Sequence, residues 1–172
     1  MLALAVFLIG TVEYIITGII EMIAVDLSIA TSDVGLLVTV FALAAALVAP
    51  LLIAFTINID RKLLLLCTYS LFILSNGMMF AHVSYDLMLW IRVLQGISGG
   101  MSTVVAMAIA TRLVNKEKRG HAIGIILMGL SSSLVLGVPI GTFFSEWLGW
   151  RTLFILVGIF SLLPLVVIYK YI

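Results

Sequence analysis

The sequence predicts an all-α membrane protein, in which residues 1–172 form one polytopic bundle of six transmembrane helices. The first observation is composition: 64% of the 172 residues are hydrophobic, only 10% are charged, and the mean hydropathy is +1.35. A soluble domain carries roughly 45–50% apolar and about 25% charged residues. A chain this short cannot hide so much apolar surface in one core. The second observation is that the apolar residues form runs of about 20, the length of a bilayer-crossing helix.

The predicted spans cover residues 2–24, 34–57, 62–82, 86–113, 121–145 and 151–172. Backbone groups in lipid must be hydrogen-bonded within their own segment, which favours helices. A barrel strand would instead show alternating hydrophobicity over about 10 residues. The polar breaks between the spans are short, and none could hold a separate domain. We therefore expect one transmembrane unit surrounded by the lipid bilayer.

Basic residues orient the predicted bundle. If successive spans alternate in direction, one side carries Arg61, Lys62, Arg112, Lys116, Lys118, Arg119 and Lys170. The other side carries several acidic residues and the single basic residue Arg151. Because cytoplasmic loops are enriched in lysine and arginine, both termini are predicted to be cytoplasmic. A net charge of +1 leaves no broad basic face for nucleic acid.

Two prolines suggest an internal repeat. Pro50 lies in the second span with Arg61 eleven residues later, and Pro139 lies in the fifth span with Arg151 twelve residues later. The second and fifth spans run in opposite directions. This is the pattern of a 3+3 inverted repeat, an arrangement found within the halves of many transporters. The alternative is a coincidence between two prolines in apolar helices.

Two charged residues interrupt the spans at depth. Arg92 lies roughly 9 Å and Glu13 roughly 16 Å below the outer surface, at about 1.5 Å per residue. A charge at the bilayer centre costs about 2.5–3.5 kcal/mol on insertion scales, so it needs a partner, a wet cavity or neutralisation. One interpretation is that Glu13 faces a central cavity and takes up a proton. The other is a static pair between Glu13 and Arg92, or a permanently protonated Glu13.

Asn76 is a further polar group at mid-depth, in the third span. It either bonds a neighbouring helix or contacts a ligand. No histidine and cysteine cluster has the spacing of metal ligands, and no glycine-rich phosphate loop with its lysine occurs. The sequence therefore predicts neither an enzyme nor a metal or organic cofactor.

Four short segments carry patterns that can be compared with known families. They are GTVEY at residues 10–14, NIDRK at 58–62, RVLQG at 92–96 and GVPIG at 137–141. In this order, on these spans, they resemble the major facilitator superfamily over essentially the whole chain. The opening GTVEY, followed by AVDL at 24–27, is similar to bacterial drug and sugar efflux permeases of the arabinose type.

The resemblance implies roles for particular residues. RVLQG matches the family motif R-x-x-Q-G, in which the arginine, here Arg92, is linked to proton coupling, and we group Gln95 with Arg92, Glu13 and Asn76 as coupling or cavity residues.

The segment NIDRK looks like the end of the motif G-x-x-x-D-R-x-G-R-R. It implies a cytoplasmic latch made by Asp60 and Arg61, with Arg112 as its ion-pair partner. Thr56 replaces the leading glycine of that motif, and the second glycine is missing.

GVPIG is similar to the antiporter motif G-P-x-x-G-G, although Val138 separates the Gly-Pro pair. Helix packing is expected at Gly96, Gly137, Pro139 and Gly141.

The resemblance implies proton-coupled efflux, or antiport, of small molecules such as drugs or sugars across the bacterial plasma (inner) membrane. The proton gradient would supply the energy. Because the chain resembles only the N-terminal half of such carriers, we expect a second six-helix half, either a missing C-terminal half or another chain. The alternatives are a uniporter or symporter half, a non-transporting truncated fragment, and a membrane scaffold.

Overall fold

The structure is a computed structural model that describes residues 1–56, 58–81 and 84–171. The predicted span limits at residues 57, 82 and 172 lie outside these residues. The helices are α1 (Leu2–Gly18), α2 (Ile20–Leu27), α3 (Thr31–Leu43), α4 (Ala49–Phe55), α5 (Arg61–Phe80), α6 (Tyr85–Arg112), α7 (Arg119–Ser132), α8 (Val138–Leu148) and α9 (Trp150–Tyr171). A short 3₁₀ turn, Lys116–Lys118, precedes α7.

The prediction of a helical membrane bundle is confirmed. Five continuous stretches of the described chain are long and apolar enough to cross a membrane: Thr31–Phe55, Arg61–Phe80, Tyr85–Arg112, Lys116–Leu148 and Trp150–Tyr171. The first predicted span is broken instead, because α1 and α2 meet at an angle of 67°. Counted as one span, this bent pair supplies the sixth.

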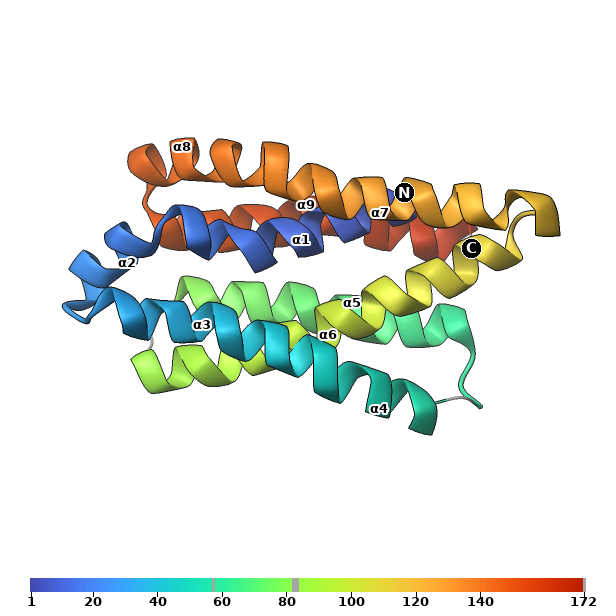
Figure 1. The fold of residues 1–172 in the computed structure, drawn as a ribbon, viewed down its shortest axis with the longest axis horizontal. Coiled ribbons are helices and arrows are strands. Elements are labelled where there is room, and N and C mark those ends of the chain that lie inside the picture. The colour runs from blue at the N-terminus through green and yellow to red at the C-terminus, as the bar shows by residue number, and fades with distance from the viewer. Residues whose placement is uncertain (57, 82–83, 172) are drawn as a thin grey trace.

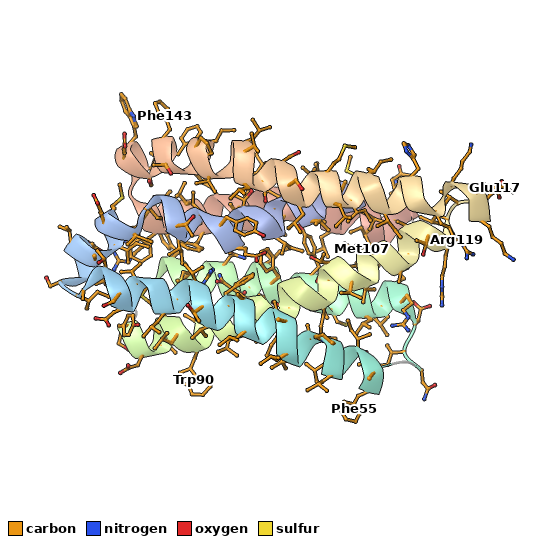
Figure 2. The ribbon with its side chains drawn as sticks, viewed as in Figure 1. Phe55, Trp90, Met107, Glu117, Arg119 and Phe143 are labelled. Carbon is orange, nitrogen blue, oxygen red and sulfur yellow. The ribbon has the colours of Figure 1, made fainter. Side chains whose placement is uncertain are left out.

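Helices α1 and α6 form the centre of the bundle. Helix α1 packs against α3, α6, α7, α8 and α9, and α6 packs against α3, α4, α5 and α7. Figure 1 shows α1 flanked by α3 on one side and α8 on the other, with α9 behind. Apolar side chains elsewhere point outward, including Phe55 (83% exposed) and Phe143 (57% exposed) (Figure 2). An exposed apolar surface of this kind marks a membrane or protein contact, and on helices long enough to cross a bilayer it fits contact with lipid.

The two chain termini lie toward the same end of the bundle (Figure 1). This end also carries Glu117, in the connection between α6 and α7, and Arg119, the first residue of α7 (Figure 2). We call it the basic end, and the end that holds the bend between α1 and α2 the opposite end.

The second and fifth spans share an internal irregularity. A π-helical turn, Ala44–Val48, joins α3 to α4, and another, Ser133–Gly137, joins α7 to α8. Each ends two residues before a proline, Pro50 or Pro139. The first π turn packs on α6 and the second on α1. This correspondence supports the predicted inverted repeat.

Close helix contacts depend on glycines whose Cα positions leave no room for a side chain. A Cβ atom on Gly96 of α6 would collide with the backbone carbonyl oxygen of Phe41. A Cβ atom on Gly137 or Gly141, on the fifth span, would collide with the side chain of Thr11 or Ile15 of α1. Small residues allow such approach in membranes, where lipid provides no hydrophobic drive between helices.

We expect Gly96→Ala to destabilise the bundle by about 1–3 kcal/mol, because the added methyl group meets backbone that cannot rotate away. The matched control is Gly124→Ala in α7, where a Cβ atom meets nothing within 4 Å. The control should be neutral or slightly stabilising, because alanine is the better helix former. The measurement is the temperature at which the detergent-solubilised chain loses its monodisperse size-exclusion peak. Equal effects of the two variants would contradict the packing argument.

Candidate functional site

The centre of the bundle holds a fully buried guanidinium. Arg92 lies in α6 with 0% of its surface exposed. Its Nε atom donates to the carbonyl oxygen of Leu37 in α3 at 3.0 Å. Its Nη1 atom donates to Val12 O of α1 at 3.1 Å, and its Nη2 atom donates to Glu13 O at 3.4 Å. One side chain therefore ties three helices together.

Neighbouring side chains complete the environment of this guanidinium. Its Nη1 atom also donates to the Oε1 atom of Gln95 at 3.0 Å. Its Cζ atom lies 4.5 Å from the ring centroid of Phe41, a cation–π distance. Carbonyl dipoles, an amide oxygen and an aromatic face thus replace the water that the charge would otherwise bind. This is a physical reason why the charge is tolerated at depth.

Two amides continue the polar contacts from α6 to α5. The Nε2 atom of Gln95 donates to Asn76 Oδ1 at 3.3 Å, and Asn76 Nδ2 donates to the carbonyl oxygen of Phe72 at 2.7 Å. Asn76 and Gln95 are both 0% exposed. Arg92, Gln95 and Asn76 form a buried series of hydrogen bonds, in which Asn76 makes the expected bond to a neighbouring helix. Their role in proton coupling or in lining a cavity stays a prediction.

Glu13 is the partly exposed member of the predicted set. Arg92 reaches its backbone carbonyl oxygen, and the two side chains make no ion pair of 4.0 Å or less. The static Glu13–Arg92 pair is therefore not formed in this structure. The carboxyl group lies near a fixed positive charge without being held by it.

A cavity opens at the opposite end, next to this face of α1. It has a volume of about 830 Å³ and is lined by Thr17, Gly18, Ile19, Ile20, Glu21, Met22, Thr31, Ser32, Thr142 and Glu146. Residues 13, 17 and 21 are spaced four apart, so Glu13 lies one helical turn from the lining residue Thr17. No pattern in the sequence indicates this cavity, because it is lined by both sides of the bend between α1 and α2, which no proline marks.

A second polar contact joins α2 to α9 at the opposite end. Asp26, at the end of α2, accepts hydrogen bonds through Oδ2 from Trp150 Nε1 at 3.1 Å and from Arg151 Nη1. The Arg151 guanidinium also stacks 4.3 Å from the Trp150 ring centroid. Among the described residues this is the ion pair that the structure forms. It joins segments 125 residues apart, so no local pattern predicts it.

The predicted latch residues lie at the basic end but are not joined. The carboxylate of Asp60 accepts a hydrogen bond from the backbone N–H of Leu63 at 3.0 Å and so caps α5. Within residues 1–56, 58–81 and 84–171, no ion pair links Asp60 to the expected partner Arg112. In place of the expected ion pair with Arg112, Asp60 caps its own helix α5. The cap fixes one side chain, whereas an ion pair between two helices would fix two.

The sequence of this chain is similar to that of a known family of membrane proteins. The family model described as Major Facilitator Superfamily matches residues 2–172. The Bacillus subtilis protein YbcL, an uncharacterized MFS-type transporter, is 36% identical over 98% of this chain and 43% of its own length. A second uncharacterized MFS-type transporter of that organism, YtbD, is 38% identical over 91% of this chain and 39% of its own length. The chain thus spans about two fifths of these relatives.

A solved structure shows the same fold. It is a bacterial homolog of the human lysosomal transporter Spinster, in an inward-facing and unoccupied conformation. The TM-score is 0.78 at 24% identity, over 98% of this chain and 42% of that chain. The six-helix bundle therefore has the fold of the part of that transporter to which it aligns.

We expect Arg92→Lys to lower stability although the charge is retained, because each lost hydrogen bond to a charged group costs about 1.5–3 kcal/mol. A lysine ammonium cannot replace the planar fork that reaches Leu37, Val12 and Gln95 together. The control is Arg112→Lys at the exposed end of the same helix, which should change stability by less than about 0.5 kcal/mol. Thermal unfolding in detergent measures both, and similar melting temperatures would contradict the role given to Arg92.

Proposed function

Because this chain belongs to the major facilitator superfamily, we propose that it forms one six-helix half of a proton-coupled secondary transporter that exports small molecules such as drugs or sugars. It would act in the bacterial plasma membrane with both termini in the cytoplasm. The basic end, with its lysine and arginine residues, supports this orientation.

The observation that carries the proposal is the environment of Glu13. Ionisable residues within membrane spans are costly and by default indicate function. Glu13 is partly exposed on α1, one turn from the cavity lining, while the adjacent Arg92 charge is satisfied by backbone and amide oxygens. The carboxyl group can therefore exchange a proton with the aqueous side without breaking the contacts of Arg92.

Proton loading and substrate binding would then compete at Glu13. A deprotonated Glu13 is attracted by the fixed positive charge of Arg92, and a protonated Glu13 is not. Each state of the carboxyl group thus changes the forces on α1 relative to α6. In this mechanism Gln95 and Asn76 hold Arg92 in place, and the proton gradient is the energy source.

The remaining motif residues fit a rocking motion. Gly137 and Gly141 give the fifth span a small-residue surface toward α1, along which the helices would slide, and the exposed Pro139 lies between them. Asp60, Arg61 and Arg112 lie at the basic end, where a latch would close in another conformational state. The local cap that Asp60 makes here is weak enough, at about 1 kcal/mol, to be exchanged for such a pair.

The transport unit requires a second bundle in this proposal. Alternating access works by rocking two bundles around a site near the membrane midplane. This chain supplies one bundle and spans 43% of YbcL and 39% of YtbD. The second six-helix half would come from the remainder of a longer protein or from another chain.

We expect Glu13→Gln to abolish proton-driven efflux, because the amide cannot take up or release the proton. The variant is tested with the chain joined to its second half in everted vesicles, with ethidium and arabinose as probe substrates and a pH-sensitive dye for proton movement. Glu117→Gln, in the exposed connection between α6 and α7, is the charge-matched control and should transport normally. Substrate movement that continues unchanged in Glu13→Gln would refute coupling at this residue. Flux without proton movement in the unmodified protein would indicate a uniporter.

A separate prediction concerns the chain by itself. Purified residues 1–172 in proteoliposomes should give no flux of either probe above that of empty liposomes when a proton gradient is imposed. The reason is that alternating access requires two bundles that rock against each other around the substrate site, and this chain supplies one. Robust gradient-driven flux from this chain alone would contradict the requirement for a second half.

A further inference from the structure

Helices α5 and α9 form a wall on the side of the bundle away from Glu13. They pack along one another in opposite directions. An apolar groove of about 250 Å³ runs between them, lined by Ile73, Leu74, Gly77, Ile155, Gly158, Ile159 and Leu162. The groove exists because two of these residues lack side chains: a Cβ atom on Gly77 would meet nothing within 4 Å.

The basic end of the same wall carries two lysines held by aromatic rings. Lys62, in the first turn of α5, places Nζ 5.8 Å from the ring centroid of Tyr169 in α9. Lys170 places Nζ 5.4 Å from the ring centroid of Tyr171. Both tyrosines are largely exposed, at 70% and 73%. Tyrosine and lysine at a helix end are typical of the level of lipid headgroups.

Charge at this rim is predominantly positive. Arg61 precedes Lys62, and the neighbouring acidic residue Asp60 uses its carboxylate to cap α5 through Leu63 N–H. Two ammonium groups and a guanidinium therefore lie at the interfacial level beside one capped aspartate. Such a rim attracts an anion that carries its charge at headgroup depth.

The distance from the lysine rim to the groove, measured along the helices, is similar to the length of one lipid acyl chain in its leaflet. Leu162 lies eight residues from Lys170, and Leu74 lies twelve residues from Lys62, which corresponds to roughly 12 Å and 18 Å along the helices. Half of the hydrocarbon core is about 15 Å thick. An acyl chain that starts at the lysine rim therefore ends in the groove.

We propose that the α5–α9 face binds an anionic phospholipid, with its phosphate between Lys62 and Lys170 and one acyl chain in the groove beside Gly77. The lipid belongs to the leaflet at the basic end. The site is separate from Glu13 and the opposite-end cavity, so it holds α5 and α9 in the bilayer without occupying the transport path.

The test is native mass spectrometry of the chain released from micelles that contain equal amounts of phosphatidylglycerol and phosphatidylcholine. The unmodified chain should retain phosphatidylglycerol preferentially. The double variant Lys62→Gln/Lys170→Gln should lose that preference, by about fivefold for each lysine. Lys116→Gln/Lys118→Gln removes the same charge from the same end of the bundle and should keep it.

A second variant tests the groove independently of charge. Gly77→Leu fills open space, so the chain should stay monodisperse while its adducts with both lipids fall severalfold. Unchanged adducts in Gly77→Leu would overturn the acyl-chain part of the proposal. Equal retention of the two lipids by the unmodified chain, or equal loss in the Lys116/Lys118 control, would overturn the headgroup part. A dimer of the chain that Gly77→Leu disrupts would show a second copy to be the occupant and would refute the lipid site.

Discussion

The interaction on which this structure depends is the burial of the Arg92 guanidinium among backbone carbonyl groups. A charge in hydrocarbon is tolerated only when dipoles replace its water, and here α1, α3 and α6 each supply acceptors. Close helix approach is the condition for these contacts. Gly96, one turn along α6, lets α6 reach the carbonyl of Phe41, whose ring in turn covers the guanidinium. The small residue and the buried charge are therefore parts of one arrangement.

The use of backbone acceptors has a chemical consequence. Carbonyl and amide oxygens do not titrate, so the Arg92 charge keeps its partners in every protonation state of its surroundings. Had the Glu13 carboxylate been the main partner, each protonation of that group would have left the guanidinium uncompensated in the membrane, at a cost of several kcal/mol. Because Arg92 contacts the backbone carbonyl oxygen of Glu13 and not its carboxylate, the proposed uptake and release of a proton at Glu13 would leave the contacts of Arg92 intact.

The sequence predicted the features that depend on length and composition. Six spans, their order and the gathering of basic residues at one end follow from apolar runs of about 20 residues and from charge placement. The sequence could not predict which residues accept hydrogen bonds from Arg92, because the acceptors are mostly backbone carbonyl groups, which every residue carries. The bend after Gly18 could not be predicted from the sequence either. Thr17 there donates its hydroxyl to Tyr14 O at 2.6 Å, a back-bond of the kind that often bends helices. Thr11 makes a similar bond to Phe7 O inside the continuous helix α1, so a threonine alone does not predict a bend.

The two π turns explain how the flanking spans can change shape around this fixed centre. The ring of a proline in a helix clashes with the carbonyl of the residue four positions earlier. For Pro50 that residue is Ala46 and for Pro139 it is Val135, and both lie inside the π turns, where the widened ladder makes room. The same turns meet the central helices at small residues, Ala45 against Gly100 and Gly137 against Thr11. Each π turn, Ala44–Val48 and Ser133–Gly137, thus combines a widened backbone hydrogen-bond pattern with close contacts to a central helix through small residues. In the proposed rocking motion, the second and fifth spans would bend at these turns while Arg92 keeps α1, α3 and α6 together.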